Sequence, residues 1–221
     1  MTEAGPPDTA ELDSFVTGYL HARQQAALAT VASSPGAVTV HYGPGMGRDV
    51  EHFVLDAARF GAGRLGHGDW LTLFGDAPLP APRADLALTP QASEHYMTAD
   101  LVTMLDHLDA APGFEAATPA DFPTPELALF RIEVEGQVIA RASCVLARGG
   151  DVILDRVATE PAWRGRGLAR RLMHAASTWA VAQGRARMLL IASPDGHALY
   201  RRLGLATRCA VHVFSATQRD H

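Results

Sequence analysis

The stretch VATEPAWRGRGLAR (157–170) decides the fold, because it joins a strand-like run to a strongly periodic helix. Its glycines, Gly165 and Gly167, predict a turn in front of that helix. From there apolar residues recur at the spacing of an amphipathic helix, and Gly184 stands where a helix commonly ends. The residues at this spacing are Leu168, Leu172, Ala175, Trp179 and Ala182. We therefore predict a glycine-rich turn that opens a helix of about four turns.

Strand-like segments flank this helix on both sides. In chain order they are 127–135, 138–146 and 152–157 before the helix and 188–192 after it, followed by a short helix at 196–203 and a last strand at 210–214. The first three alternate apolar and polar residues between glycine turns, which is typical of an antiparallel meander. A helix between two strands usually makes a right-handed parallel crossover. We therefore expect 152–192 to form a strand, helix, strand unit on a mixed sheet.

The N-terminal part of the chain is less regular. Its composition predicts a helix over 10–32, ended by Ser33-Ser34-Pro35-Gly36, then the strands 37–42, 50–55 and 69–74. Three prolines at 78, 80 and 82 predict a linker over 75–83. After it we expect a strand at 86–89, a helix over 98–108 with Thr98 as its N-cap, and a loop over 112–125. The chain therefore divides into an α/β region, 1–83, and a larger domain, 84–221.

Two other glycine-rich stretches are predicted to be loops. GAGRLG (61–66) is a literal G-x-G-x-x-G that follows a strand-like run. The dinucleotide-binding fingerprint must open a helix, whereas this stretch leads into the strand-like 69–74. GPGMG (43–47) likewise does not open a helix, so it too is predicted to be a turn.

The turn at 164–170 is predicted to bind an anion. Small residues allow close approach of a ligand, the turn directs N–H groups outward, and the helix N-terminus adds partial positive charge. Arg164, Arg166 and Arg170 add full positive charges, which a first helical turn disfavours unless an anion lies among them. A phosphate or pyrophosphate fits this chemistry. The alternative is a glycine-softened turn with solvated arginines.

Three segments together resemble the GNAT superfamily of acetyl-CoA-dependent N-acyltransferases. Arg164-Gly-Arg-Gly167-Leu-Ala169 matches the family signature [QR]-x-x-G-x-[GA]. The preceding LDRVAT (154–159) looks like the family's fourth strand, and ALYRRLGL (198–205) resembles its later LYxxLGF segment. Order, spacing and element type agree over about 127–214. The resemblance implies an α/β fold with a GNAT-like mixed sheet flanked by helices, 84–221 as the acetyl-CoA domain, and 1–83 as an accessory α/β region, which a degenerate GNAT-like half would fit.

The resemblance also implies a set of site residues. Backbone groups of Val157 and Thr159 would bind the pantetheine arm, and Tyr200 would protonate the departing thiolate of coenzyme A. Tyr200 also reads as a core tyrosine beside Leu203. Ser193 lies where many relatives have asparagine, and its hydroxyl would supply part of that hydrogen bond. The N–H groups that would hold the pyrophosphate belong to Arg164, Gly165, Arg166, Gly167, Leu168, Ala169 and Arg170.

The general base is less determined. An ammonium acceptor must lose a proton before or during attack on a thioester, which a carboxylate, a histidine or a water relay can accept. Asp151, Ile153, Asp155 and Val157 alternate onto one face of their strand, and Asp155 is the nearer acid to the turn. Either Asp151 or Asp155 is a candidate base, although both also suit a solvated strand edge. Glu160 and His197 are further candidates.

Composition excludes several other chemistries. All 19 basic residues among the 221 are arginine, so P-loop and Schiff-base mechanisms, which need lysine, have no support. Cys144 and Cys209 are too few for a zinc ribbon or an iron–sulfur site, and no HExxH or G-x-S-x-G exists. We expect no metal. No secretion signal or bilayer-length apolar run is present, so we expect a cytoplasmic protein with no membrane partner.

Charge is unevenly distributed along the chain. Residues 1–160 hold 9 Arg against 22 Asp and Glu, net −13, whereas 161–221 hold 10 Arg against 2 Asp, net +8. This favours a polyanionic ligand at one end and a cationic acceptor at the other, and argues against nucleic acid as a partner.

We therefore expect a transferase that moves an acetyl group from acetyl-CoA, its acyl-donor substrate, directly to an amine acceptor. The alternative is a non-catalytic acyl-CoA-binding sensor or interaction module. The acceptor and the oligomeric state stay open, with a homodimer among the alternatives.

Overall fold

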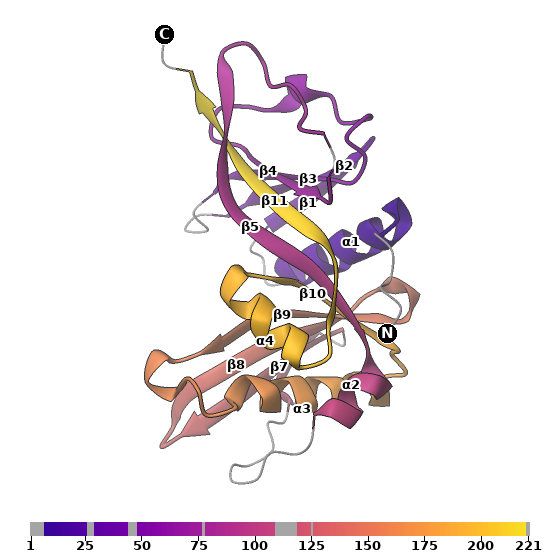
Figure 1. Cartoon of the computed structure of the whole chain (residues 1–221), viewed down its shortest axis with the longest axis vertical. Helices are drawn as coiled ribbons and strands as arrows, with labels where there is room; N and C mark the ends of the chain where they lie inside the picture. The colour runs from indigo at the N-terminus through magenta and orange to yellow at the C-terminus, as the bar shows by residue number, and fades with distance from the viewer. Residues whose placement is uncertain are drawn as a thin grey trace. The chain divides into compact units, whose positions relative to one another are not determined.

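The computed structural model describes residues 7–25, 29–43, 48–76, 78–108, 119–124 and 126–219. The chain forms two compact units (Figure 1). The first contains the chain up to Tyr96, Ile191–His197 and the segment from Thr207 onward; the second contains Met97–Leu190 and Ala198–Ala206. This division assigns no function, so the accessory region at 1–83 and the acetyl-CoA domain at 84–221 stay predictions.

The first unit is a six-stranded mixed sheet with one N-terminal helix. Its strand order is β1-β2-β3-β4-β11-β5, with β3 and β4 parallel and β1-β2, β2-β3 and β4-β11 antiparallel. Its elements are α1 (Thr9–Gln25), β1 (Ala29–Ser34), β2 (Ala37–Tyr42), β3 (Val50–Val54), the 3₁₀ turn η1 (Ala62–Arg64), β4 (Trp70–Phe74) and most of β5 (Leu86–Asp100) and β11 (Ala206–Gln218).

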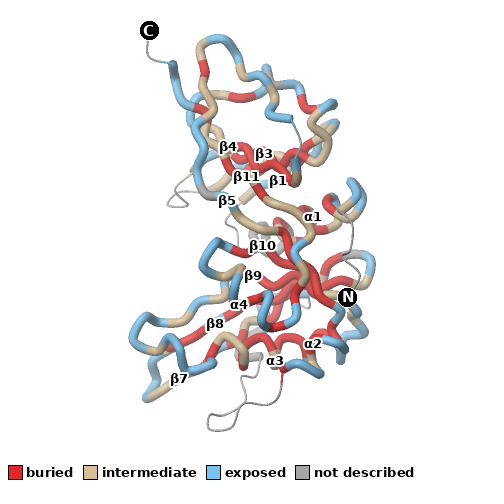
Figure 2. Tube along the Cα trace, viewed as in Figure 1, coloured by how far each residue is buried: buried red, intermediate tan, exposed pale blue. Residues whose placement is uncertain are grey.

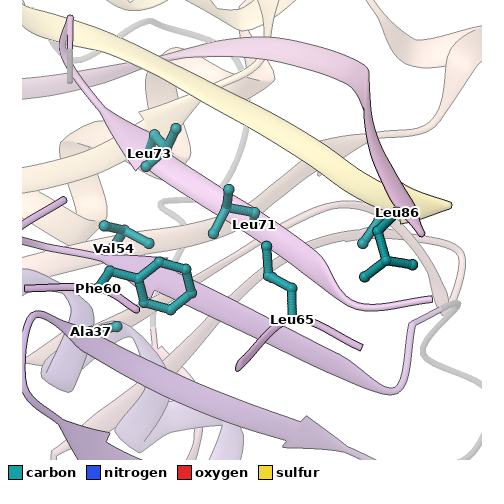
Figure 3. Close-up of a cluster of buried hydrophobic side chains, with 8 residues drawn as sticks. Ala37, Val54, Phe60, Leu65, Leu71, Leu73 and Leu86 are labelled. Carbon is teal, nitrogen blue, oxygen red and sulfur yellow. The ribbon is translucent and has the colours of Figure 1, made fainter. Parts of the chain in front are cut away.

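The core of the first unit lies partly under a loop. Phe60 and Leu65 come from the crossover between β3 and β4, and they pack with Leu71 and Leu73 of β4 (Figure 3). Each of these side chains is almost completely buried. The crossover therefore contributes apolar side chains to the core, although its only helical turn is the short η1.

The second unit is built around the predicted helix. Its strands follow the order β10-β9-β8-β7-β6, with β9 and β10 parallel and the others antiparallel. Its elements are α2 (Leu101–His107), β6 (Pro119–Thr124), β7 (Leu127–Val134), β8 (Gln137–Leu146), η2 (Arg148–Gly150), β9 (Asp151–Thr159), η3 (Pro161–Trp163), α3 (Leu168–Ala182), most of β10 (Arg187–Ala192) and the C-terminal part of α4 (Pro194–Arg202).

Helix α3 packs against β7, β8 and β9 and against α2. Its buried face includes Leu172, Met173 and Ala176, and Trp179 makes an edge contact with Phe130 of β7 at 6.1 Å between ring centroids. Figure 2 shows the buried trace concentrated along α3 and the strands. Of the residues predicted to share this face, Leu168 and Leu172 are buried and Ala175 and Trp179 half-buried, but the prediction is wrong for Ala182, which is exposed at the end of the helix.

Most predicted elements are confirmed, including the meander, α3, α4, and the strand, helix, strand unit from β9 to β10. The predicted helix over 10–32 is wrong beyond Gln25, because 29–34 forms β1. The residues that were expected to end the helix instead turn the β1–β2 hairpin. At that turn Gly36 has φ +78°, and an added Cβ would lie 2.6 Å from the Asp56 carbonyl oxygen.

Two further predictions are wrong in detail. The helix expected from Thr98 begins at Leu101, because Asp100 accepts a hydrogen bond from the Thr103 N–H at 2.8 Å and is the N-cap. Residues 98–100 instead continue β5, which is much longer than the predicted 86–89. The loop expected over 112–125 contains β6; its residues 112–118 and 125 lie outside the described residues.

Candidate functional site

The glycine-rich turn between β9 and α3 is open and lacks a side-chain cap. Gly165 and Gly167 both have φ +75°, and Gly167 is the N-cap residue of α3. The first intrahelical bond is donated by the Arg171 N–H at 3.2 Å, so the N–H groups of the preceding turn need another acceptor. An added Cβ at either glycine would meet no atom within 4 Å. The turn therefore has space in front of it and donors at a helix N-terminus, as an anion site requires.

The three arginines of the turn contact neighbouring parts of the second unit. The Arg164 Nε donates to the Thr159 carbonyl at 3.3 Å, at the end of β9. The Arg170 Nη2 donates to the carbonyl of His107 at 2.7 Å, in the last turn of α2. The Arg166 guanidinium lies over the Trp163 ring at 4.6 Å. The side chains thus hold the turn in place while their charges stay beside it, and Arg164 and Arg166 are exposed.

Strand β9 has an open edge on the side of β10. The parallel pairing between them is confined to 187–189 against 151–153. Beyond Ile153, β9 continues to Thr159 without a parallel partner among the described residues. Its backbone groups on this edge can pair with an extended ligand, as an exposed strand edge does in β-augmentation. This open edge includes the predicted Val157 and Thr159 and leads into the glycine turn.

A β-bulge lies in the same stretch, on the side of β8. The register shifts by one residue between the pairs Ser143–Asp155 and Arg141–Ala158. Within the bulge Arg156 has φ +54°. A non-glycine residue in this region costs on the order of 1 kcal/mol, and such strain is found mainly at functional sites. The sequence did not predict this bulge.

The bulge also changes which side chains share a face of β9. The predicted alternation holds from Asp151 to Asp155, but the extra residue places Ala158 on that face and removes Val157 from the regular pattern. The expectation that Val157 shares a face with the two acids is therefore wrong.

Tyr200 is held in the second unit with its side chain largely buried. It lies in α4 and is 8% exposed. Burial, together with the smaller effect of the nearby Asp155 carboxylate, raises the pKa of its phenol to about 12. The hydroxyl therefore keeps its proton throughout the neutral range, as an acid requires. The structure thus places Tyr200 and Asp155, far apart in sequence, within electrostatic range of each other.

The two predicted acids of β9 have different surroundings. Both oxygens of Asp151 accept hydrogen bonds from Arg187 of β10, each at 2.9 Å, and the Asp151 side chain is only 6% exposed. Asp155 is 18% exposed, and its Oδ2 lies 3.7 Å from the Nε of Arg156. Asp151 therefore joins the two strands where they pair, whereas Asp155 lies where they no longer pair.

Of the remaining predicted residues, Ser193 and His197 belong to the first unit and Glu160 to the second. Ser193 precedes α4, and its Oγ accepts a hydrogen bond from the Gly196 N–H at 3.2 Å, so it caps that helix. His197 stacks on His95 at 3.8 Å between centroids, and its Nε2 lies 2.7 Å from the Thr207 hydroxyl. Glu160 is exposed at the end of β9, where its N–H donates to the Ile139 carbonyl.

The sequence model of the acetyltransferase (GNAT) family matches residues 94–205, slightly more than half of the chain. The chain therefore belongs to the GNAT acetyltransferase family. Membership implies acyl-CoA-dependent acyl transfer. The matched residues include the predicted cofactor turn, both acids of β9 and Tyr200. A comparison with curated proteins finds no match.

Solved structures of GNAT proteins share the fold over almost the whole chain. One is a GCN5-related N-acetyltransferase from Kribbella flavida, with 11% identity, coverage of 99% of this chain and 98% of that chain, and a TM-score of 0.60. Another is a GNAT-family protein from Novosphingobium aromaticivorans, with 20% identity, coverage of 95% and 99%, and a TM-score of 0.56. At these identities the likeness establishes the fold, and the expected GNAT-like α/β class is confirmed.

The described residues contain neither a membrane-spanning helix nor a cluster of metal ligands. Among the described residues, no helix is both long and apolar enough to cross a bilayer. In the same part of the chain, no group of three or more His, Cys, Asp or Glu side chains is arranged to hold a metal ion.

Proposed function

We propose that the protein is an N-acetyltransferase that moves the acetyl group of acetyl-CoA directly to an amine acceptor. The observation that carries the proposal is the open edge of β9, which leads without interruption into the uncapped glycine turn of α3. Acetyl-CoA has an amide-containing pantetheine arm followed by a pyrophosphate. An extended pairing edge followed by an anion site suits these two parts in that order.

In this proposal the backbone does most of the donor binding. Val157 and Thr159 pair with the pantetheine amides through their backbone groups. The N–H groups of the turn and of the first helical turn bind the pyrophosphate, assisted by the partial charge of the helix. The donors run from Arg164 through Gly165, Arg166, Gly167, Leu168 and Ala169 to Arg170.

The chemical step uses two side chains that lie near each other. The acceptor amine loses a proton to Asp155, directly or through water, and attacks the thioester carbonyl. As the carbon–sulfur bond breaks, the Tyr200 hydroxyl gives its proton to the departing thiolate. Backbone donors polarise the carbonyl in the transition state. Asp155 suits the role of base better than Asp151, because its side chain is more exposed and interacts electrostatically with Tyr200.

The cysteines support direct transfer. Burial raises the pKa of the fully buried Cys144 thiol well above its ordinary value and that of Cys209 to about 11. Neither thiol supplies the thiolate that a covalent acyl-cysteine intermediate needs at neutral pH. A ternary complex of donor, acceptor and enzyme avoids such an intermediate.

The test is acetyl-CoA turnover across a broad panel of primary amines, measured as release of free coenzyme A and as acetylated product. We expect at least one amine class to be acetylated, with product and free coenzyme A formed in equal amounts. Acetyl-CoA binding without turnover of any amine would contradict the proposal and favour a non-catalytic acyl-CoA-binding module.

A further inference from the structure

Two arginines lie directly opposite each other on the sheet of the second unit. Arg131 of β7 pairs with Arg141 of β8 in the antiparallel register, so their side chains share one face. Opposed residues have Cβ atoms about 4.5 to 5.5 Å apart, and like charges at that separation are destabilising. Both arginines are exposed, and among the described residues neither guanidinium has an ion-pair or hydrogen-bond partner. An anion bound between them would remove the repulsion.

This face is the one that carries the proposed base. Ser143, two residues from Arg141, lies opposite Asp155 in the next strand. The other face is covered by α3, as the contact between Phe130 and Trp179 shows. The arginine pair and Asp155 therefore lie on the sheet face opposite α3, which is exposed at the two arginines and buried at Ser143.

The separation between the arginine pair and Asp155 suits a small molecule with a charged group at each end. Diagonal neighbours on adjacent strands have Cβ atoms about 7 to 8 Å apart, and an extended arginine spans most of that distance. A guanidinium from Arg141 can therefore reach a group bound next to Asp155. Guanidinium groups match carboxylates in geometry and bind them with two parallel hydrogen bonds.

Other charged residues also lie on this face. Glu133 lies two residues beyond Arg131 on the same side of β7, and it too is exposed. Asp151 and Arg187 lie on the same face and pair with each other. On their own two strands, Arg131 and Arg141 thus have one carboxylate on their face, that of Glu133. The net charge of −13 over 1–160 predicts a cationic acceptor, but the two facing arginines favour an acceptor that also carries an anion.

We infer that Arg131 and Arg141 bind the carboxylate of the acceptor, so that the substrate class is an amine that bears its own carboxylate, such as an amino acid. The inference rests on the proposed function and specifies its acceptor. The amine would lie at Asp155 and the carboxylate between the two guanidinium groups. In the free protein the two guanidinium groups repel each other, and a bound carboxylate would remove this repulsion.

The experiment compares matched amines that differ only in this group, for example phenylalanine with phenylalanine amide and leucine with leucine amide. Initial rates of acetylation are measured for the wild type, for the Arg131→Gln, Arg141→Gln double variant and for each single variant. Arg83→Gln is the matched control, because Arg83 is an exposed arginine of the first unit paired with Asp85. Acetyl-CoA affinity is measured for every variant to establish that the donor site is intact.

We expect the wild type and Arg83→Gln to prefer the carboxylate over the amide by about 10- to 100-fold in kcat/KM, the range expected for charge-assisted hydrogen bonds. In the double variant this ratio falls to about 1, with intermediate ratios in the single variants. A wild type that prefers the amide, or a preference that survives in the double variant, would overturn the inference while leaving the proposed function standing. Turnover of no amine at all would overturn both.

Discussion

The two units each contain one pair of parallel strands joined by a glycine-rich crossover, and the two crossovers differ. In the first unit β3 and β4 pair along 51–54 and 70–73, almost their whole length. In the second unit β9 and β10 pair over three residues only, and β9 then continues to Thr159 paired with β8 on its other side. The backbone groups between β3 and β4 are therefore used in strand pairing along almost the whole length. Beyond the short β9–β10 pairing, the backbone groups on that edge of β9 stay available to a ligand.

The crossovers themselves explain the difference. In the first unit the Asp69 carboxylate accepts a hydrogen bond from the Gly66 N–H at 2.6 Å and lies 3.3 Å from the Nε2 of the buried His52. The glycine loop is thus bound to its own protein. In the second unit the glycines open a helix of 15 residues, whose dipole favours an external anion. A glycine-rich sequence alone therefore does not define an anion site. Such a site also needs a helix that begins directly after the glycines.

The largest effect is expected from Tyr200→Phe, which removes the proposed acid from the second unit. Without a proton donor the thiolate must leave unprotonated, so kcat should fall by about 100-fold while acetyl-CoA affinity is retained. Steady-state kinetics and calorimetry measure the two quantities. Tyr96→Phe is the matched control, because Tyr96 is a fully buried tyrosine of the first unit whose hydroxyl donates to Glu11. Equal turnover of the wild type and Tyr200→Phe would remove Tyr200 from the mechanism.

Asp155→Asn should lower kcat by about 10- to 100-fold and also lower the pKa of Tyr200. The second effect follows because the Asp155 carboxylate contributes to raising that pKa from 10.0 to about 12. A raised folded-state pKa stabilises the protein fully below pH 10, and this contribution is lost as the pH rises toward 12. In the variant, the loss should begin at the same pH, set by the unfolded chain, but should be smaller and complete at a lower pH.

Ultraviolet titration of tyrosinate, with Tyr200→Phe as the reference, measures this pKa. Chemical denaturation at several pH values measures the stability. A Tyr200 pKa that is the same in Asp155→Asn as in the wild type would show that the two groups do not interact.

Asp151→Asn tests whether Asp151, on the same strand as Asp155, has a structural or a catalytic role. Removing the charge weakens the pair with Arg187, and because Arg187 is 41% exposed the loss should be moderate, about 2 kcal/mol of unfolding free energy. Turnover at a temperature where the variant is folded should stay close to that of the wild type. A fall in kcat as large as that of Asp155→Asn would make Asp151 the better candidate for the base.

The smallest effect is expected from Arg156→Gly at the bulge. Glycine adopts φ +54° without steric strain, so the unfolding free energy should rise by up to about 1 kcal/mol, reduced by the greater freedom of glycine in the unfolded chain. Gly36→Ala is the opposite change in the first unit and should destabilise, because its Cβ would clash with Asp56. Denaturant titration measures both. A clear loss of stability in Arg156→Gly would mean that the arginine side chain outweighs the strain.

Periodicity predicted the second unit better than the first. The helix at 168–182 could be predicted because its apolar residues lie against one sheet, which is the arrangement that produces a 3.6-residue pattern. The predicted helix at 10–32 ran too far because the alanine-rich residues near Ala29 favour a helix locally, whereas pairing with β2 makes 29–34 a strand. Strand pairing of this kind depends on residues distant in sequence.

The candidate site shows the same limit. The turn at 164–170 and Tyr200 could be singled out from local motifs, although their roles stay predictions. The pair Asp151–Arg187 could not, because its partners are 36 residues apart. The bulge could not be predicted either. Arg156 has a positive φ, which arginine rarely adopts, so its residue type indicated a regular strand. Ser193 followed by proline is a common helix start, and this signal would have predicted its capping role.

The central claim is that only the second crossover binds the donor, and two double variants make a matched test of it. Arg166→Glu with Gly167→Glu places two carboxylates in the open turn of α3. Gly63→Glu with Arg64→Glu makes the same change in the glycine loop of the first unit, where both residues are exposed. Gly167→Ala is included as well, because any side chain at φ +75° strains the backbone and this variant adds no charge.

The most direct measurement is calorimetric titration of acetyl-CoA and of free coenzyme A into the wild type and these three variants. We predict binding to the wild type and to the first-unit variant, weakened binding to Gly167→Ala, and none to Arg166→Glu with Gly167→Glu. Undiminished binding to the last variant, or no binding to the wild type, would contradict the assignment of the donor site to the turn before α3.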